Sequence, residues 1–533
     1  MSNYLMRPQV SWTRRAIAIL TGSLVGLYGN MPLVGSQAAQ AITTAHCQLL
    51  PAVAREKENL RKVALNGDVE LQQQYQTMVS QHAAQLLACR RRNWPQNQAI
   101  WLRLYPCDIQ PGALDFLMDR LVNLGYNQVY VEVFYDGQVL LPMADNRTPW
   151  PSVVRSPGTE RIDLLAEAIK KGRERGLKVY AWMFTMNFGY IYSQLPGREQ
   201  ALARNGDNHT SVSIHEKARH STGYNLRQGD SDQVFIDPYN PQAKRDYYYM
   251  LHAVLQRRPD GVLFDYVRYP RLTGKASVAS RVQDLWIYGR ASQQNLYQRA
   301  FNQKGRELIR RFLEQGFITV PDIRAVDKLY PNEGEPLWQG RKLDNIYPAE
   351  QTESERPQED EIVDETESYE QVKARQAQLQ LELWHLTVTH AVQGILDFVK
   401  IASYAAERQG IPTGVVFFPS ANKTIGQGFD SRLQPWDRFP SWMEWHPMSY
   451  GVCGNASCIL SEVKRVLSFA PHNAQIQPVL AGNWGRAIRN RPSLEAQMQA
   501  IRQVAPQIRT ISHFAYSWQE PVIDRDRMLC QGR

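Results

Sequence analysis

Short apolar segments alternate with amphipathic helical patterns from residue 99 to the end of this 533-residue chain. Strands that alternate with helices form parallel sheets, and eight such repeats predict closure into a (β/α)8 TIM barrel. An open doubly wound sheet is the alternative α/β fold, but no glycine-rich phosphate loop follows the first strand. The strands are expected at residues 99–105, 128–135, 178–186, 261–269, 412–419, 442–450, 475–481 and 510–518.

Helical patterns fall between most of these strands. The fifth connection, residues 420–441, has the composition of a loop, and little sequence follows the eighth strand. The helices are expected at residues 112–124, 163–175, 243–256, 282–315, 381–408, 461–469 and 494–504.

Two segments are additional to a plain barrel, which we assign to residues 96–533. Residues 42–95 hold two polar helical patterns and predict an N-terminal helical hairpin. Residues 271–380, after the fourth strand, are far too long for a barrel loop and predict a helical insertion. Within the insertion, residues 350–370 carry ten acids and one Arg. This composition predicts a disordered linker, with a docking tail for a basic partner as the alternative.

The first 41 residues have the order of a secretory signal peptide. Three arginines without an acid precede a short apolar run, and Ala39-Gln40-Ala41 supplies small residues for cleavage. An uncleaved N-terminal anchor is the alternative. We expect an exported protein, periplasmic or extracellular at the cell envelope, with no stable membrane span after signal cleavage.

All six cysteines follow the expected cleavage site, and an even number is typical of disulfides in an oxidising compartment. None has the spacing of a metal site, so we expect no metal. An antiparallel hairpin, a tight loop, and the neighbouring first and eighth strands of a closed barrel each bring two cysteines together. We predict the disulfides Cys47–Cys89, Cys453–Cys458 and Cys107–Cys530.

The formal net charge of +9 is modest for a chain of this length. It fits an anionic environment such as a cell wall and lacks the clustered basic residues of a nucleic-acid-binding protein. We expect a polysaccharide as the partner, no nucleic acid and no cofactor.

The fourth predicted strand lies in the sequence PDGVLFDYVRYP, residues 259–270. A buried parallel strand that ends in a carboxylate is how a barrel of this kind builds an active site. Asp265 is therefore the first candidate for a catalytic residue, although a cap of the next segment or a partner of Arg268 is the structural alternative. Glu132, which is expected on the same face of its strand as Phe134, is the second candidate. Asp136, Glu444 and Glu520 are alternative carboxylates near other strand ends.

Residues near the strand ends are also candidates for sugar contacts, because aromatic, amide and guanidinium groups there face a common rim. For each one, packing or a turn is the alternative role. The candidates for substrate binding are Trp182, Asn187, Asp237, Arg268, Tyr269, His446, Tyr450, Trp484 and Trp518.

Several of these stretches resemble the bacterial glycosyl hydrolase-like family 10, exported TIM-barrel proteins related to glycoside hydrolases. The matching sequences are DLLAEAIKKGRERGLKVYAW at 163–182, FIDPYNPQAKRDY at 235–247 and DGVLFDYVRYP at 260–270, with fainter matches in VYVEVFYDG at 129–137 and WHPMSYG at 445–451. The resemblance implies the barrel fold and hydrolysis of glycosidic bonds, with cell-wall glycan as a substrate class. Two departures, Phe134-Tyr135 and Met448, stand where the family carries Arg and Gln, and they imply an altered substrate contact.

Three functions follow from these observations. The first is an exported glycoside hydrolase that acts on an envelope or extracellular polysaccharide, such as the glycan of peptidoglycan, with Asp265 and Glu132 as its carboxyl pair. The second is a non-catalytic glycan-binding barrel, and the third is a structural envelope protein. The chain lacks the D-x-x-D-x-D-x-E pattern of chitinases on its fourth strand.

The acidic segment gives a first test. Deletion of residues 350–370 should change the thermal midpoint and the turnover of small substrates very little, because like charges and few apolar side chains cannot offset the entropy of ordering. A midpoint that falls by many degrees would show that the segment is ordered and packed.

Overall fold

The computed structural model describes residues 45–214, 233–341 and 368–530. The predicted signal peptide, residues 1–41, and residues 350–367 of the predicted acidic linker lie outside them. Within the described residues, no helix combines the length and the apolar character needed to cross a bilayer.

Eight parallel strands close into a barrel, which confirms the predicted (β/α)8 fold. Closure is made by β1, which pairs in parallel with β13 on one side and with β2 on the other. Around the ring the strands are β1 (Asn97–Leu102), β2 (Gln128–Tyr135), β4 (Lys178–Phe184), β5 (Gly261–Asp265), β7 (Thr413–Phe417), β10 (Glu444–Ser449), β12 (Val479–Ala481) and β13 (Thr510–Phe514).

Aromatic rings fill the barrel interior. The ring of Trp101 lies 4.9 Å from that of Tyr130 and 4.8 Å from that of Trp182, both at steep angles. Tyr130 also contacts Tyr180 at 5.4 Å and His446 at 5.5 Å between centroids. Large side chains on alternate residues thus make the interior a packed core, and open space begins only above them.

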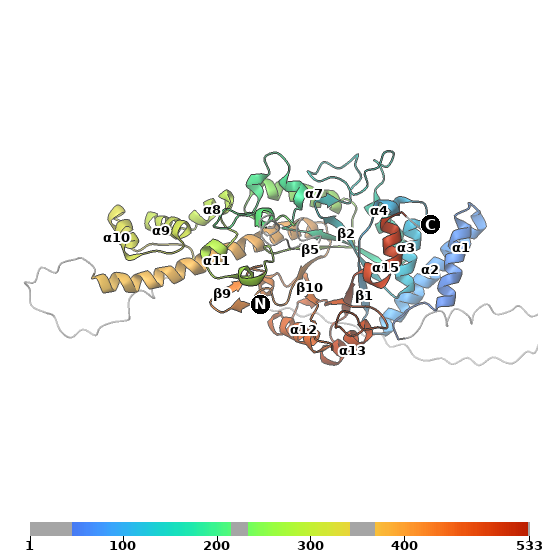
Figure 1. Ribbon diagram of the computed structural model, residues 1–533. Helices are drawn as coiled ribbons and strands as arrows, with labels where there is room; N and C mark the ends of the chain where they lie inside the picture. Colours follow the sequence, from blue (N-terminus) through green and yellow to red (C-terminus); the bar gives the residue numbers. More distant parts are fainter. Residues whose placement is uncertain (1–44, 215–232, 342–367, 531–533) are drawn as a thin grey trace, which may run out of the picture. The chain divides into compact units, whose positions relative to one another are not determined.

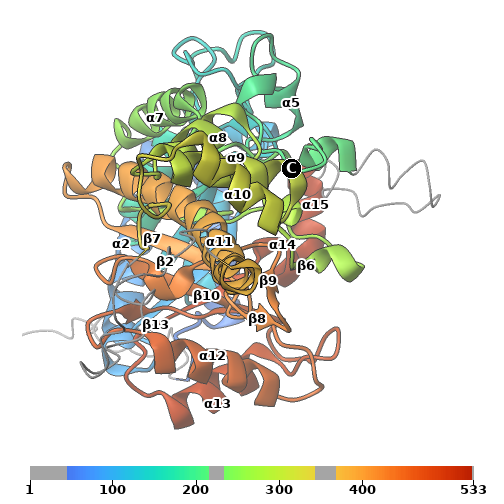
Figure 2. The ribbon, with the colours of Figure 1, turned by 90° about the vertical axis from the view of Figure 1, so that its left-hand side faces the viewer.

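Helices cover the outside of the barrel, as Figures 1 and 2 show for α12 and α13, which lie side by side. The connection after β7 is a loop, as predicted, with the short strands β8 (Thr424–Ile425) and β9 (Gly428–Asp430). The eighth strand ends at Phe514 and not at residue 518, and the short sequence after it forms α14 (Tyr516–Gln519), which leads into α15. The outer helices are α3 (Ala113–Asn123), α4 (Leu164–Glu174), α7 (Pro241–Leu255), α11 (Tyr369–Glu407), α12 (Ser457–Phe469), α13 (Leu494–Val504) and α15 (Pro521–Met528).

The prediction of a single helix at 282–315 is wrong, because two helix caps interrupt it. Asp237 accepts a hydrogen bond from the backbone N–H of Ser292 at 2.9 Å and thereby caps α8 (Arg290–Tyr297). Asn302 accepts one from Gly305 and caps α9 (Gln303–Gln315). Sequence periodicity runs through both positions, but the caps start new helices with new axes.

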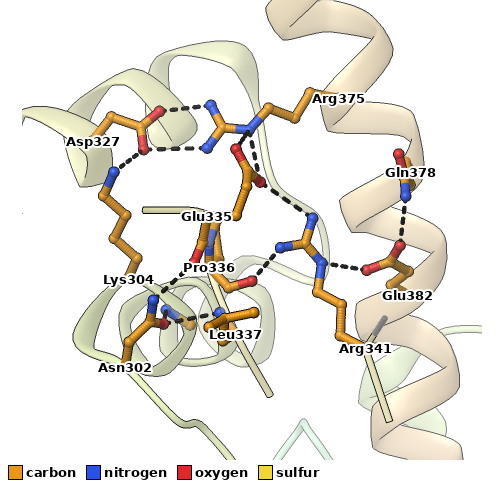
Figure 3. A network of polar contacts seen from close by, with 11 residues as sticks. Asn302, Lys304, Asp327, Glu335, Pro336, Leu337, Arg341, Arg375, Gln378 and Glu382 are labelled. Atoms are coloured by element: carbon orange, nitrogen blue, oxygen red, sulfur yellow. Dashed lines mark hydrogen bonds and ion pairs between the residues drawn. The ribbon is translucent and has the colours of Figure 1, made fainter. Parts of the chain in front are cut away.

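The insertion lies along the N-terminal half of α11. In both views α8, α9 and α10 (Val320–Leu329) lie next to this helix (Figures 1 and 2). Figure 3 shows the polar network that joins them: Arg375 of α11 pairs with Asp327 and Glu335, and Asp327 also pairs with Lys304. The helix expected from residue 381 begins at Tyr369, where Ser368 and Gln371 form a capping box. The prediction of disorder is therefore wrong for residues 368–370, which belong to this helix and its cap.

The predicted N-terminal hairpin consists of α1 (Pro51–Ala64) and α2 (Val69–Arg92). It packs on α3 and α4 through a buried carboxylate, Asp119. This group accepts hydrogen bonds from Tyr75 at 2.5 Å and Arg175 at 2.9 Å, and lies 3.5 Å from the ammonium of Lys57. Removal of one partner from such a buried network leaves an uncompensated charge, so the hairpin is attached firmly to the barrel.

The three disulfides of the structure are Cys47–Cys89, Cys107–Cys530 and Cys453–Cys458, the predicted pairs. The first ties the start of the hairpin to its end. The second joins the segment after β1 to the end of α15, across 423 residues of chain. The third joins two cysteines that are only five positions apart in the chain after β10.

Loss of the long-range disulfide should destabilise the fold most. Replacement of both Cys107 and Cys530 by Ser should lower the free energy of unfolding by about 2–4 kcal/mol, because a disulfide that closes a long loop restricts the unfolded chain most. The matched control replaces Cys453 and Cys458 by Ser and should lower the free energy of unfolding by a smaller amount. Urea unfolding of both double variants measures the difference, and equal losses would contradict this account of the Cys107–Cys530 bridge.

Candidate active site

A cavity of about 570 Å³ opens above the aromatic core, at the C-terminal ends of the barrel strands. This is the end at which barrels of this fold place their active sites. Its walls come from seven of the barrel strands or the segments that follow them. The side chains that line it include Trp101, Arg103, Tyr105, Glu132, Asp136, Trp182, Phe184, Gln233, Asp265, Tyr266, Arg268, Phe418, Met448, Tyr450, Phe514, Ser517 and Asp524.

Asp265 ends β5 and is fixed by two hydrogen bonds. One carboxylate oxygen accepts from the backbone N–H of Tyr266 at 2.6 Å, and the other accepts from the indole N–H of Trp182 at 3.1 Å. Tyr266 follows with φ of 52°, a left-handed conformation that is uncommon for a bulky residue and recurs at functional sites. The strand thus turns sharply after Asp265 and leaves its carboxyl group on the cavity wall.

Burial raises the pKa of the Asp265 carboxyl above its usual range. The N–H of Tyr266, the charge of Arg268 and the indole of Trp182 act in the opposite direction but do not cancel it. Among the described residues, no cation comes within ion-pair distance of this carboxylate. Asp265 can therefore hold a proton at higher pH than an exposed aspartate.

Glu132 reaches the cavity from β2, where its backbone is level with Trp182 of β4. The prediction that it shares its alternation with Phe134 is wrong, because the register between β2 and β4 shifts between these two residues. The shift is a β-bulge, which inserts one residue and reverses the alternation. Glu132 points into the barrel, whereas Phe134 packs outside it against Trp150, with 4.6 Å between centroids.

Glu132 is paired with Arg103, which lies just past β1. The Nε–H of Arg103 donates to a carboxylate oxygen of Glu132 at 2.5 Å, and a terminal nitrogen lies 3.5 Å from Asp136. Burial raises the pKa of Glu132 to about 7, with smaller contributions from the charges of Asp136 and Asp265, while Arg103 acts in the opposite direction. Glu132 therefore changes its protonation state near neutral pH.

Arg103 is one of several cavity residues, with Phe184 and Phe514, that the sequence analysis did not predict. The signal was present, since Arg103 shares the alternation of Trp101 in the segment AIWLRLY and must face the same interior. Its guanidinium also lies 4.2 Å from the ring centroid of Tyr135. Arginine at a strand end is common on protein surfaces, so only the position of Glu132 on the next strand identifies its role.

Aromatic rings form the rest of the cavity wall. Phe184 lies 4.3 Å from Tyr266, and Phe514 lies 6.2 Å from Trp182 and 5.9 Å from Tyr450, between centroids. Flat apolar faces of this kind can stack on the C–H faces of sugar rings. Of the predicted residues, Asp265, Glu132, Asp136, Trp182, Arg268 and Tyr450 come together here.

Other predicted residues lie away from the cavity in structural roles. Asn187 accepts hydrogen bonds from Gly189 and Val234, and Asp237 caps α8. Tyr269 is fully buried and donates to the carbonyl of Ala391. These three hold the loops that carry the cavity in place, and the geometry gives them no direct contact with its lumen.

The remaining candidates are displaced by their depth or by the face of the strand on which they lie. Glu444 and His446 sit inside the barrel below the cavity, 3.3 Å apart, because β10 begins at Glu444. Trp484 lies on the outer face against His513. Trp518 lies under the guanidinium of Arg489, and Glu520 pairs with Arg120.

The chemistry of the cavity is that of two buried carboxyl groups with different partners. Across residues 45–214, 233–341 and 368–530, no three His, Cys, Asp or Glu side chains gather as a set of metal ligands. The carboxyls, two arginines and an aromatic wall can bind a polar ring, donate a proton and accept one.

Most of the charged residues of the cavity lie in a part of the chain that matches a known family. Residues 99–311 match the family model of glycosyl hydrolase-like 10. The match confirms the resemblance seen in the sequence, and it contains Arg103, Glu132, Trp182, Asp265 and Arg268. A search of curated proteins found no match.

Solved structures that match parts of this chain include several glycosidases. A β-galactosidase from the psychrophilic Marinomonas ef1 is 10% identical over 81% of this chain and 58% of that chain, with a TM-score of 0.43. The GH20 catalytic modules of the pneumococcal exo-β-D-N-acetylglucosaminidase are 10% identical over 82% and 84%, with a TM-score of 0.38. A hypothetical protein from Ruminiclostridium thermocellum is 15% identical over 32% and 77%, with a TM-score of 0.22. The chain thus spans little more than half the length of the β-galactosidase.

Proposed function

We propose that this protein hydrolyses glycosidic bonds in an envelope or extracellular polysaccharide, with peptidoglycan glycan as the first substrate to test. The observation that carries the proposal is the pair of buried carboxyl groups, Asp265 and Glu132, that face one aromatic-lined cavity at the C-terminal rim of the barrel. Hydrolysis of a glycosidic bond requires two such groups, one on each side of the bond. The match of residues 99–311 to a glycosyl hydrolase-like family supports this reaction class.

The surroundings of the two carboxyls suggest different roles. Burial raises the pKa of both groups, so their partners distinguish them: Asp265 has, within the described structure, no ion-pair partner, which suits a general acid that protonates the leaving oxygen. Glu132 is paired with Arg103, which stabilises its ionised form and suits attack on the anomeric carbon or activation of water. The wall formed by Trp182, Phe184 and Phe514 would hold the sugar between the two groups.

Export to the envelope is part of the proposal. Three disulfides suit an oxidising compartment, and the N-terminal sequence has the order of a signal peptide. Cell-wall glycan is available there. Fractionation of cells and N-terminal sequencing of the mature protein test the location directly.

A non-catalytic glycan-binding barrel is the second candidate, and the ion pair of Glu132 with Arg103 is the observation that favours it. If this pair persists when a glycan is bound, Asp265 is left as a lone carboxyl in an aromatic cavity. A purely structural envelope protein fits less well, because the barrel mouth holds an open cavity of about 570 Å³.

Removal of either carboxyl tests catalysis. Asp265→Asn and Glu132→Gln should each retain the fold and lower turnover of peptidoglycan or related β-linked glycans by roughly 10²–10⁴-fold, the range for loss of a positioned acid or base. Glu520→Gln is the matched control, because Glu520 also follows a strand end but pairs with Arg120 away from the cavity. Release of reducing ends measures turnover. Wild-type activity in Asp265→Asn would refute its assignment.

The pH profile tests the role of Arg103. Since Glu132 must be ionised, kcat/KM should fall as the pH drops through its pKa of about 7. Arg103→Gln removes the charge that lowers this pKa, so the acid limb of the profile should move to higher pH. Arg103→Lys retains the charge and should move it less. An unchanged limb in Arg103→Gln, or a shift to lower pH, would contradict the role of Arg103.

A further inference from the structure

Arg268 places a buried cation in the cavity wall. The residue is only 6% exposed, and it follows Asp265 by three positions in the segment after β5. Its guanidinium lies over the ring of Tyr266 at 4.6 Å, with Phe235 at 5.5 Å and Phe418 at 5.8 Å. Three aromatic faces therefore fix its position, and cation–π attraction offsets part of the cost of burial.

The donors of this guanidinium are largely unused. One terminal N–H donates to the carbonyl of Tyr269 at 2.9 Å. Within residues 45–214, 233–341 and 368–530, no carboxylate lies within ion-pair distance of Arg268. Burial lowers the pKa of its guanidinium, while Tyr266 and the carboxyl of Asp265, which lies beyond ion-pair distance, act in the opposite direction. Arginine stays charged in proteins, so the cation has no ion-pair partner in this part of the structure.

Other buried arginines of this protein are satisfied differently. Arg432 lies over the same Phe418 ring at 4.9 Å, but Asp430 neutralises it at 2.7 Å. Arg90, which is 1% exposed, donates to the carbonyls of His46, Pro95 and Gly125. Arg268 differs from both because its partner is missing and its side chain lines the cavity.

We propose that Arg268 binds a carboxylate carried by the substrate, so that the cavity selects an acidic sugar. This inference rests on the proposed function. A carboxylate matches the planar fork of a guanidinium in geometry and in its single charge. A doubly charged anion would fit less well than a carboxylate, because the carboxyl group of Asp265 is close enough to act on the pKa of Arg268. Arg271 is exposed, 5.8 Å from Phe418, and is not among the residues that line the cavity, so it can serve as the control for Arg268.

The position of Arg268 specifies where the acidic sugar binds. Arg268 and Asp265 belong to the same strand end, and Phe418 follows the adjacent strand, β7. The carboxylate-bearing ring would therefore lie against the β5–β7 side of the cavity, next to the group that donates the proton. The side of β1 and β2, with Arg103 and Glu132, faces the other part of the substrate.

Matched glycans test this inference. The probes are peptidoglycan glycan strands stripped of peptide, either untreated or with their carboxylates reduced to alcohols. Wild type should prefer the untreated strands by about 10- to 100-fold in kcat/KM, the effect of a charge-assisted hydrogen-bond pair. In Arg268→Gln this ratio should fall to about 3-fold or less. Arg268→Lys should give an intermediate ratio, and Arg271→Gln, an exposed control, should stay near the wild-type ratio.

Several outcomes separate the possible failures. Equal cleavage of both strands by wild type overturns the inference and leaves the proposed function intact. An equal loss on both strands in Arg268→Gln, with an unchanged thermal midpoint, also overturns it and makes Arg268 a partner of Asp265. If wild type cleaves neither strand, the proposed function fails. In that case calorimetry measures the affinity of wild type and of Arg268→Gln for both kinds of strand. The ratio of the affinities for untreated and reduced strands then tests the inference in the same way.

Discussion

The pairing of β1 with both β13 and β2 is the constraint on which the rest of this structure depends. These two pairings close the sheet, so that every strand sends alternate side chains into one interior and ends at one rim. Glu132, Trp182 and Asp265 come from three neighbouring strands, and closure brings Phe514 of β13 to the same rim. The disulfide between Cys107 and Cys530 joins the segments that follow the first and last strands and so reinforces the same closure.

The interior changes in character from one end of the barrel to the other, and this change produces the chemistry of the cavity. Toward the N-terminal ends of the strands, Glu444 accepts a hydrogen bond from Tyr180 and lies beside His446. Above them, Trp101 and Trp182 exclude water. The carboxyls at the rim stand on this aromatic layer, and burial there raises the pKa of both Asp265 and Glu132. Their different partners, an indole for Asp265 and a guanidinium for Glu132, then distinguish two groups of the same chemical type.

Much of the fold and part of the site could be predicted from the sequence. The barrel strands, the helical hairpin and the cysteine pairs follow from periodicity and from the neighbours that closure creates. Asp265 and Trp182 reach the cavity because strand alternation holds along β4 and β5. The bulge after Glu132 could not be predicted, because an inserted residue leaves no mark in the alternation of apolar residues that are buried on both faces.

The sequence also could not show how deep in the barrel a residue lies along its strand. His446 has the alternation of an interior residue, but β10 starts at Glu444, so His446 lies in the core below the rim. Caps supplied by distant residues, such as Asp237 at the start of α8, depend on tertiary contacts and broke a helix that periodicity predicted as continuous. Arg103 became visible as a site residue only when its partner Glu132 was placed beside it.

The central claim is that Asp265 and Glu132 act as a unit on one bond. The most direct test compares kcat/KM for Asp265→Asn, Glu132→Gln and the double variant on the same glycan. Groups that act together in one transition state give grossly non-additive losses. The account predicts that the double variant is about as impaired as the worse single variant. If the two losses multiply instead, the residues act independently, and the assignment of a catalytic pair is contradicted.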